Sequence, residues 1–274
     1  MPELPEVETI KRDLEKFLSR KRISKVTTID KRVVRQKSVE EFERLLQGQT
    51  IQSISRRGKA VIFLLSNGFN WVVQPMMTGQ LVFCADKKTF QAVKETKIIF
   101  EFTSGEILAY NDQRLFGRHL IVRDLTEISY FKLIGPEPFE EKFTSDWMKT
   151  ILRKKSIAIK NALMDHRVVA GVGNIYASEI LFESRISPRR KSSSLTSKEI
   201  VGLIDSTRSV LEQAIKLRGS SMRNYRDGLG QKGEFNTRVK VYGRDDQSCV
   251  RCQSPILRIV QGGRSTFYCK KCQH

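Results

Sequence analysis

Residues 60–73 read Ala60-Val-Ile-Phe-Leu-Leu-Ser-Asn-Gly-Phe-Asn-Trp-Val-Val73, and they decide the fold class of the first half of the chain. Ser66-Asn-Gly68 is a turn signal that separates two predicted strands, Ala60–Leu65 and Trp71–Val73. The same pattern recurs along the chain, with a second turn signal at Ser104-Gly105. The further predicted strands are Arg22–Thr28, Thr50–Ser55, Lys97–Phe102, Ile107–Tyr110 and Arg118–Val122. Short strands in succession, with little helix between them, predict an antiparallel sandwich or barrel.

Helical periodicity borders this strand-rich region on both sides. From Leu4 to Leu18 apolar residues recur every three or four positions, which predicts an amphipathic helix that begins almost at the first residue. Pro2 and Pro5 fall in or before its first turn, where no intrahelical N–H is missed. Ser220–Gly233 is rich in glycine, has no apolar periodicity and is a predicted loop. The predicted helices after residue 138 are Trp147–Arg153, Ala158–Met164, Ile175–Glu183 and Leu195–Leu217.

A chain of 274 residues exceeds the usual size of one domain, so two or three modules are expected. Leu133-Ile-Gly-Pro-Glu-Pro138 contains two prolines and a glycine and is a predicted linker. The predicted division is a β-sandwich domain over residues 1–132, a linker over 133–143, a helical domain over 144–237 and a cysteine-containing tail over 238–274. The predicted fold class is therefore α+β.

The charge of the chain indicates its partner. Lys and Arg number 49 against 30 Asp and Glu, which gives a net charge of +19, and the excess lies mainly in the C-terminal half. A basic balance on this scale favours a polyanion, and in a folded chain it favours nucleic acid. An acidic lipid, polyphosphate or a merely solubilising surface is the alternative.

Several classes of protein are excluded. The longest purely apolar run, Ala60–Leu65, is far shorter than the ~20 residues that cross a bilayer. The N-terminus is acidic where a signal peptide is basic, so we expect an intracellular protein of the cytoplasm. His119, His166 and His274 are the only histidines, and they form no HExxH pair, Cys2His2 finger or three-histidine metal centre at a recognisable spacing.

Four of the five cysteines form two pairs, Cys249-Val-Arg-Cys252 and Cys269-Lys-Lys-Cys272, with sixteen residues between them. Two thiolates three positions apart bind one tetrahedral Zn²⁺, and the second pair completes four sulfur ligands, so the predicted metal is structural. It would supply stability that the small core of the tail lacks. Two disulfides or unrelated thiols are the alternatives. Cys84 is the fifth cysteine, and its apolar, strand-like setting predicts a core position.

The stretch between the cysteine pairs contains Gln261-Gly-Gly-Arg264. Two glycines before an arginine predict a hairpin tip that points the guanidinium outward and lets the backbone approach a ligand closely. The alternative is an ordinary hairpin with a solvated arginine.

Pro2 is a candidate nucleophile. A proline in this position is common, but removal of the initiator methionine would expose its secondary amine. An α-amino group has a pKa of ~8 against ~10.4 for lysine, so more of it is neutral at pH 7. Such an amine is a ready nucleophile for an aldehyde-like carbon.

Motifs in order along the whole chain resemble those of the bacterial formamidopyrimidine-DNA glycosylases, the Fpg/MutM family. They are Met1-Pro-Glu-Leu-Pro-Glu-Val-Glu-Thr9, Arg56-Arg-Gly-Lys59, Met77-Thr-Gly79, Asp112-Gln-Arg-Leu-Phe-Gly117, Gly135-Pro-Glu-Pro138, Gly171-Val-Gly-Asn-Ile-Tyr-Ala-Ser-Glu179, Val241-Tyr-Gly-Arg244, Gly262-Gly-Arg-Ser-Thr266 and Cys272-Gln273. The start Pro-Glu-Leu-Pro is similar to this branch, whereas the related endonuclease VIII enzymes typically begin Pro-Glu-Gly-Pro. The resemblance implies an N-terminal antiparallel β-sandwich flanked by helices, a helix–two-turns–helix domain with a lesion-capping loop, and a zinc-finger β-hairpin.

The resemblance also implies catalytic roles. Pro2 would attack C1′ of the damaged nucleoside, and Glu3 would act as general acid and base, its alternative being a simple charge at a helix N-terminus. Glu6 matches a residue that supports the site. Lys59 would donate a proton near the lesion, and Arg264 would hold a flanking phosphate and assist the second elimination.

The implied DNA contacts lie in two groups. Asn174 resembles the phosphate-binding residue of the helix–two-turns–helix, a role compatible with an N-cap. Lys155 and Lys160 match basic residues that contact DNA, and Tyr242 is a weaker phosphate candidate. The second group, Met77, Arg114 and Phe116, matches the trio that fills the gap left by a flipped base.

Three positions depart from the family pattern. Gln74 and Glu95 stand where the family often has histidines associated with DNA contacts. Glutamine can replace a neutral phosphate donor, but a carboxylate facing DNA would be repulsive, so no role passes to Glu95. Leu115 replaces a basic residue and costs one charge.

These observations predict a bifunctional DNA glycosylase and AP lyase of base excision repair. It would excise 8-oxoguanine and formamidopyrimidines through an N-terminal proline imine with β,δ-elimination. We expect one structural Zn²⁺, double-stranded DNA with oxidised bases or abasic sites as partner, no membrane, a monomer, and a bacterial nucleoid-associated location. The rivals are an endonuclease VIII-type enzyme for oxidised pyrimidines and a zinc-ribbon DNA-binding protein without catalysis. The Pro2–Glu3 pair argues against the latter, which needs no free N-terminal amine.

Overall fold

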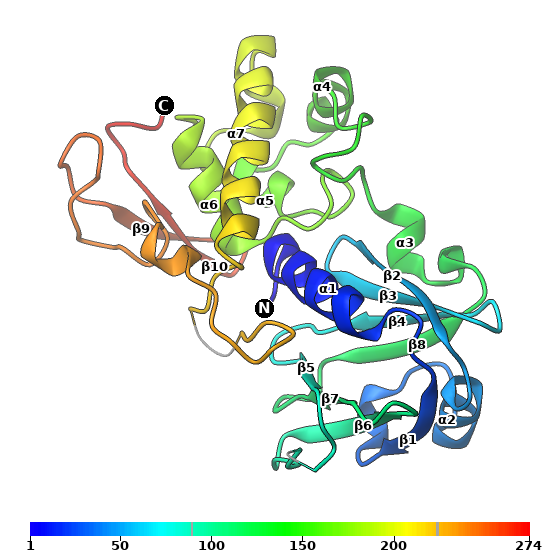
Figure 1. Cartoon of the computed structure of the whole chain (residues 1–274). Helices are drawn as coiled ribbons and strands as arrows, with labels where there is room; N and C mark the ends of the chain where they lie inside the picture. Colours follow the sequence, from blue (N-terminus) through cyan, green and yellow to red (C-terminus); the bar gives the residue numbers. More distant parts are fainter. Residues whose placement is uncertain (89, 223–224) are drawn as a thin grey trace. The chain divides into compact units, whose positions relative to one another are not determined.

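The computed structural model describes residues 1–88, 90–222 and 225–274. The chain divides into two compact units, Met1–Lys132 with Leu217–Asn236, and Leu133–Lys216 with Thr237–His274. The first contains two antiparallel sheets, and the second contains helices and a two-stranded hairpin (Figure 1). The predicted α+β class is confirmed. The four-part division stays a prediction, and it differs from the two units in segment 217–236, which it assigned to the helical domain.

Two four-stranded sheets form the sandwich of the first unit, with the spatial orders β1-β6-β7-β5 and β2-β3-β4-β8. All seven predicted strands are present, with bounds that differ by at most two residues. Strand β5 was not predicted, because it is an edge strand in which only Leu81 is buried. The bounds are β1 Ile23–Thr28, β2 Ile51–Arg57, β3 Ala60–Leu65, β4 Asn70–Gln74, β5 Gln80–Cys84, β6 Thr96–Phe102, β7 Ile107–Asn111 and β8 Arg118–Val122.

Aromatic side chains from both sheets fill the core of the sandwich. The ring of Trp71 in β4 stacks on Phe63 in β3 at 4.2 Å between centroids, and it lies 4.4 Å from Phe100 in β6 of the other sheet. The Trp71 indole Nε1 donates a hydrogen bond of 3.2 Å to Nδ1 of His119. His119 is fully buried, and this burial lowers its pKa to about 3, so the ring is neutral at pH 7.

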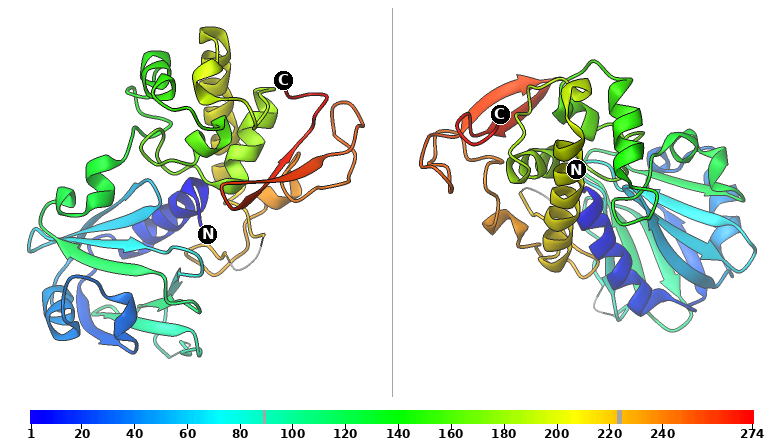
Figure 2. Two further views of the ribbon diagram at one scale, coloured as in Figure 1. Left: turned by 180° about the vertical axis from the view of Figure 1, so that it is seen from behind. Right: turned by 90° about the horizontal axis from the view of Figure 1, so that it is seen from above.

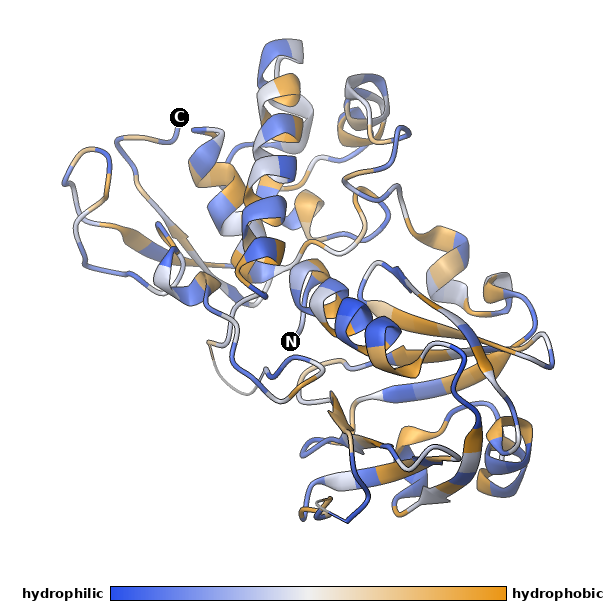
Figure 3. Ribbon diagram, in the orientation of Figure 1, coloured by the Kyte–Doolittle hydropathy of each residue, from blue (hydrophilic) through white to orange (hydrophobic). Residues whose placement is uncertain are grey.

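Helix α1 (Leu4–Leu18) packs on strands β2 and β3. It needs an apolar stripe only on the side that faces the sheet, and Figure 3 shows hydrophilic residues over much of its remaining surface. The other helical segments of this unit are shorter and are η1 (Lys31–Val33), α2 (Val39–Leu46) and η2 (Leu125–Glu127), and η4 (Phe235–Thr237) crosses the boundary after Asn236. The stripe predicted for α1 is fully buried and comprises Leu4, Val7, Ile10, Leu14 and Leu18.

Segment Leu217–Asn236 returns to the first unit and is anchored on α1. The Arg218 guanidinium lies 2.6 Å from Asp13 and 2.5 Å from Asp227. The backbone N–H of Gly228 donates to the Asp13 carboxylate at 3.2 Å. As predicted, the described part of Ser220–Gly233 contains no helix or strand.

The second unit combines helices with a hairpin, and Figure 2 shows α6 beside strand β10. Helix α7 packs on both α4 and α6. None of the helices in the described ranges is long and apolar enough to cross a membrane. The bounds are α3 Ser129–Leu133 at the junction of the units, α4 Ser145–Arg153, α5 Ile159–Leu163, α6 Asn174–Glu183, η3 Ser192–Ser194, α7 Ser197–Lys216, β9 Leu257–Gln261 and β10 Arg264–Tyr268.

Candidate active site and metal centre

The N-terminal residues lie at the start of helix α1. Pro2 is buried, Glu3 is 3% exposed, and Met1 in front of them is 52% exposed. Glu3 is the N-cap residue, and its carboxylate accepts a hydrogen bond from the backbone N–H of Glu6. The helix N-terminus places partial positive charge beside this carboxylate. Glu3 therefore performs the capping role that the sequence left as an alternative, and that role leaves a catalytic one open.

Glu6 links the helix start to the returning segment. One oxygen of its buried carboxylate, Oε2, accepts from the Glu3 N–H at 2.8 Å, and the other, Oε1, accepts from the Ser220 N–H at 2.6 Å. The Tyr225 hydroxyl also donates to the Glu6 carbonyl at 3.3 Å. The resemblance assigns a supporting role to Glu6, but the sequence does not indicate that its partners are Glu3, Ser220 and Tyr225.

Lys59 lies in the tight turn between β2 and β3, where Gly58 has a φ of 58°. This turn is tied to α1, because Arg56 donates to Glu8 of the helix at 2.9 Å and to the Gly58 carbonyl at 3.0 Å. Burial of Glu8 acts to raise its pKa, but hydrogen bonds from Arg56 and Arg12 outweigh this and lower it. Lys59 is half-buried and belongs to the same unit as Pro2 and Glu3.

Met77, Arg114 and Phe116, here called the wedge residues, meet at the surface of the first unit. Met77 and Phe116 are large apolar side chains with 40% and 47% exposure. The Arg114 guanidinium lies 4.8 Å from the centre of the Phe116 ring, and its Nη1 is 3.2 Å from the Met77 sulfur. The structure therefore brings Met77 together with Arg114 and Phe116, which lie almost forty positions later in the sequence.

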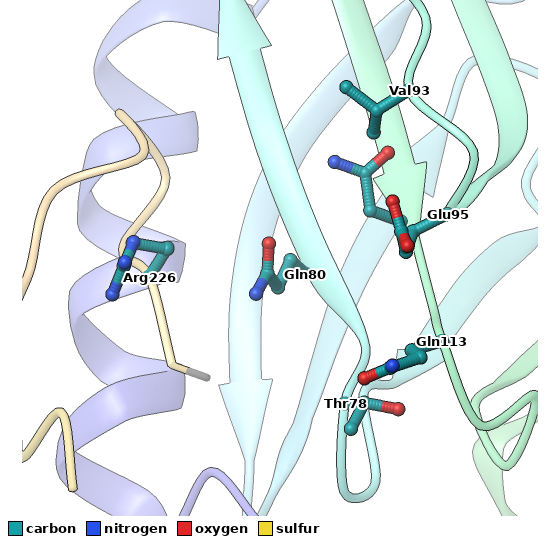
Figure 4. A pocket seen from close by; sticks show the side chains of 7 residues that line it. Thr78, Gln80, Val93, Glu95, Gln113 and Arg226 are labelled. Carbon is teal, nitrogen blue, oxygen red and sulfur yellow. The ribbon is translucent and has the colours of Figure 1, made fainter. Parts of the chain in front are cut away.

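A pocket of about 360 Å³ lies beside the wedge residues, since Thr78 and Gln113, the neighbours of Met77 and Arg114, line it. Figure 4 shows Arg226 on one side of this pocket and Glu95 on the other, with Gln80 between them. Glu95 is half-buried. The lining is mostly polar, which suits a hydrogen-bonding ligand better than an apolar one.

Gln74 and Leu115 are the other two positions that differ from the family pattern. Gln74 lies in the sandwich, and Leu115 lies in the loop that carries Arg114 and Phe116. Gln74 is 8% exposed at the end of β4, where it pairs with Arg118 of β8. Leu115 has a φ of 59° and packs partly against the core. Leu115 therefore packs against the apolar core at a position where a basic side chain would extend into solvent. Cys84 is half-buried on edge strand β5, so its predicted core position is corrected.

Lys160 and Asn174 form the centre of a network in the second unit. Lys160 is fully buried, and its amine donates to Asn174 Oδ1 at 2.5 Å, to Thr266 Oγ1 at 2.7 Å and to the Ser265 carbonyl at 3.1 Å. Asn174 is the first residue of α6, after the N-cap Gly173, and its amide donates to the Ser265 carbonyl at 3.1 Å. Lys160, which the resemblance assigns to direct DNA contact, is therefore buried inside the unit.

The other three candidate residues of this unit are Arg264, Tyr242 and Lys155, and of these Tyr242 is bonded to Asn174. Arg264 is exposed and opens strand β10, directly after Gly262 and Gly263 with φ of 54° and 71°. The predicted hairpin tip is present. The side-chain amide of Asn174 donates a hydrogen bond of 3.4 Å to the hydroxyl of Tyr242. Lys155 is half-buried and pairs with Asp165 at 2.8 Å.

Glu179 is a supporting residue that sequence analysis left without a role. Its carboxylate is 3% exposed and accepts backbone hydrogen bonds from Lys240 and Tyr242 at 2.8 Å and from Val241 at 3.0 Å. Burial raises the pKa of Glu179, although these hydrogen bonds oppose the rise. The available signal in the sequence was a carboxylate between apolar residues of a short helix, Tyr176 and Phe182.

The four paired cysteines gather at the base of the β9–β10 hairpin. Their sulfur atoms all lie within 4.8 Å of one another, with 3.9 Å between Cys249 and Cys272 and 3.4 Å between Cys252 and Cys269. A tetrahedral Zn²⁺ with Zn–S bonds of ~2.3 Å requires sulfur separations of roughly 3.8 Å. Disulfide sulfurs lie ~2.05 Å apart, much closer than either of these separations, so the disulfide alternative fails. The residues fit one structural zinc ion.

Comparison with known proteins finds matches over the whole length of the chain. Three family models match in order: "Formamidopyrimidine-DNA glycosylase N-terminal domain" at residues 1–119, "Formamidopyrimidine-DNA glycosylase H2TH domain" at 134–226, and "Zinc finger found in FPG and IleRS" at 246–274. The formamidopyrimidine-DNA glycosylase of Desulforamulus reducens is 40% identical over 276 residues, which span 100% of this chain and 99% of the relative.

Two solved structures are similar over nearly the whole chain. The complex between Lactococcus lactis Fpg and DNA containing an abasic site is 36% identical, with a TM-score of 0.92 and 99% of each chain covered. MutM (Fpg) from Thermus thermophilus is 36% identical, with a TM-score of 0.89 and coverage of 99% of this chain and 98% of that one. The chain therefore belongs to the formamidopyrimidine-DNA glycosylase family.

Proposed function

We propose that this protein is a bifunctional DNA glycosylase and AP lyase that excises 8-oxoguanine and formamidopyrimidines from duplex DNA. The observation that carries the proposal is the placement of Pro2 and Glu3 at the positive end of α1, where removal of Met1 would free a secondary amine next to a carboxylate. A mutant of the Lactococcus lactis relative was solved with Fapy-dG-containing DNA, and the relative itself with abasic-site DNA, which supports the same substrate class.

The first half of the proposed reaction removes the base. The Pro2 nitrogen forms a bond to C1′ while the bond from C1′ to the base breaks, and the departing base takes up a proton as the nitrogen loses one. The C1′–O4′ bond then opens, and Glu3 donates a proton to O4′. The nitrogen lone pair completes a cationic imine between Pro2 and the sugar. Lys59, in the turn tied to α1 through Arg56, would help protonate the leaving base.

The second half cleaves the strand. The imine makes the C2′ proton acidic, and its loss expels the 3′ phosphate by β-elimination. A further proton loss, from C4′, expels the 5′ phosphate by δ-elimination and leaves a one-nucleotide gap with phosphate at both ends. Arg264, exposed at its hairpin tip, would stabilise the departing phosphate.

The remaining assigned residues would bind the duplex. Asn174 and Tyr242 would contact phosphates, and Lys155 would add positive charge near them. Because Lys160 is fully buried, we propose that it supports DNA binding by orienting Asn174. The wedge residues would fill the gap left by the extruded nucleotide, with the Arg114 guanidinium reading the O2 and N3 acceptors of cytosine.

Borohydride reduction tests the proposal directly. Incubation with an 8-oxoguanine:cytosine duplex and borohydride should trap a covalent adduct, and peptide sequencing should place it at residue 2. Pro2→Gly keeps an amine that is less basic and less rigid, so it should slow trapping markedly. An adduct that maps to an internal lysine contradicts the mechanism. Faster excision of thymine glycol than of 8-oxoguanine would instead favour an oxidised-pyrimidine glycosylase, and a 3′ unsaturated aldehyde as sole product would exclude δ-elimination.

A further inference from the structure

Asp112 lies directly after β7 and begins the loop that carries Arg114 and Phe116, and a second loop, between β4 and β5, carries Met77. Its carboxylate is fully buried. One oxygen, Oδ1, accepts from the Thr78 hydroxyl and from the Arg114 N–H at 3.2 Å. The other, Oδ2, accepts from the Gly117 N–H at 2.8 Å and from the Tyr110 hydroxyl at 3.2 Å. A single buried carboxylate is thus bonded to both loops.

Tyr110 fills the space between the same two loops. A Cβ atom at Gly117 would lie 1.5 Å from the Tyr110 hydroxyl oxygen, and one at Gly79 would lie 2.3 Å from it. Glycine is required at both positions because the phenol passes so close to the backbone. Burial raises the pKa of Tyr110 well above its ordinary value, so the hydroxyl keeps its proton and remains a donor to Asp112.

Thr78 completes the connection between the loops. Its hydroxyl donates to Asp112 and accepts a hydrogen bond of 3.0 Å from the Arg114 backbone N–H. Thr78 immediately follows Met77, so one hydroxyl joins the loop of one wedge residue to the backbone of another. The same two loops also meet through Arg114 Nη1, which lies 3.2 Å from the Met77 sulfur.

We propose that Asp112, Thr78 and Tyr110 form a positioning cluster that fixes the spacing of Met77 from Arg114 and Phe116, and thereby sets which partner base is accepted opposite the extruded nucleotide. The inference rests on the proposed function, because it assumes that the wedge residues enter DNA. Because the cluster orders both loops before DNA binds, binding does not have to supply the free energy of ordering them. A guanidinium held at one position also reads one pattern of acceptors, whereas a mobile guanidinium adapts to several.

A matched pair of variants at Thr78 tests the positioning role. Thr78→Val keeps the shape of the side chain and removes the hydroxyl, whereas Thr78→Ser keeps the hydroxyl. We expect Thr78→Val to reduce about tenfold the preference in kcat/KM for 8-oxoguanine opposite cytosine over 8-oxoguanine opposite adenine, as one lost hydrogen bond to a carboxylate would. Thr78→Ser should retain the preference.

A second measurement avoids chemistry altogether. The Kd for a duplex with tetrahydrofuran, an uncleavable abasic analogue, opposite cytosine or adenine should show the same loss of preference in Thr78→Val. Tyr110→Phe should behave similarly, and its thermal unfolding should show whether the sandwich remains intact. Cleavage of a pre-formed abasic site in single-stranded DNA serves as the internal reference, because it involves no partner base.

The possible outcomes separate the cluster from the reaction. An unchanged partner-base preference in both Thr78→Val and Tyr110→Phe overturns the inference. An equal loss for both partner bases and for the abasic site also overturns it, because that result describes a general defect. If the unsubstituted protein excises 8-oxoguanine without any partner preference, the positioning role falls and the glycosylase proposal stands. If it excises nothing, the proposed function itself fails.

Discussion

Acidification should destabilise the sandwich through a single side chain, His119. The ring is fully buried and its pKa is lowered to about 3, so in the folded protein it stays neutral down to that pH. In the unfolded chain a histidine binds a proton below about pH 6.5. Unfolding therefore takes up a proton between these two values, and the free energy of unfolding falls as the pH falls through the window from about 6.5 to about 3.

The size of the effect follows from the width of that window. One pKa unit corresponds to about 1.4 kcal/mol, so the loss at pH 4.5 is about 2.7 kcal/mol and approaches ~5 kcal/mol near pH 3. A domain is stable by only ~5–15 kcal/mol, so the loss is a large fraction of the total. The Trp71 indole donates to His119 Nδ1, which places the proton of the neutral ring on Nε2 within the aromatic core.

Urea unfolding at pH 7 and pH 4.5 checks this value. Trp71 fluorescence reports on the sandwich in a Trp147→Phe background, because those are the two tryptophans of the chain. His119→Asn provides the control, since its amide oxygen can accept from Trp71 and does not titrate. The protein with His119 should lose about 2.5 kcal/mol more than the variant between the two pH values. Equal losses would show that burial of His119 does not control acid stability.

Three further predictions concern zinc, catalysis and charge. Cys269→Ala should release the zinc ion and abolish DNA binding by disordering the hairpin that carries Arg264; metal analysis showing no zinc in the unsubstituted protein, with binding intact, would contradict this. Lys59→Ala should slow 8-oxoguanine excision more than cleavage of a pre-formed abasic site, since only excision must expel a base, and a parallel loss in the two assays would exclude that role. Glu95→Gln should tighten binding to an abasic duplex at about 50 mM salt and have less effect at about 200 mM, because screening weakens the repulsion it removes; anisotropy titrations measure both, and unchanged affinity at low salt would show that Glu95 does not face DNA.

The features that sequence analysis predicted correctly are those in which one local pattern has one physical solution. The apolar spacing from Leu4 to Leu18 can be buried only along one stripe of a helix, and that stripe is buried. Cys249, Cys252, Cys269 and Cys272 have few alternatives at their spacing, and their sulfurs gather within reach of one metal ion.

Features that depend on long-range packing could not be predicted in this way. Segment 217–236 belongs with the first unit because Asp13 of α1 binds Arg218, more than two hundred residues later. Strand β5 lies at the edge of its sheet in the part of the chain that the structure describes. With only Leu81 buried, it shows no alternation of buried and exposed residues that would indicate a strand. Lys160 is a basic residue in a basic chain, so nothing local indicated that Asn174 and strand β10 would bury it.

Buried carboxylates hold candidate site residues or their neighbours in place in both units. Each accepts backbone N–H groups from a segment that lacks regular hydrogen bonding, and such donors would be costly to bury without an acceptor. The backbone donors are Glu3 and Ser220 for Glu6, Arg114 and Gly117 for Asp112, and Lys240, Val241 and Tyr242 for Glu179. An amide in any of these places would turn an NH₂ group toward a backbone N–H, so no neutral isostere satisfies the same donors. In a chain with a net charge of +19, the exposed positive side chains are thus available for a polyanion, while buried negative ones fix the loops that present them.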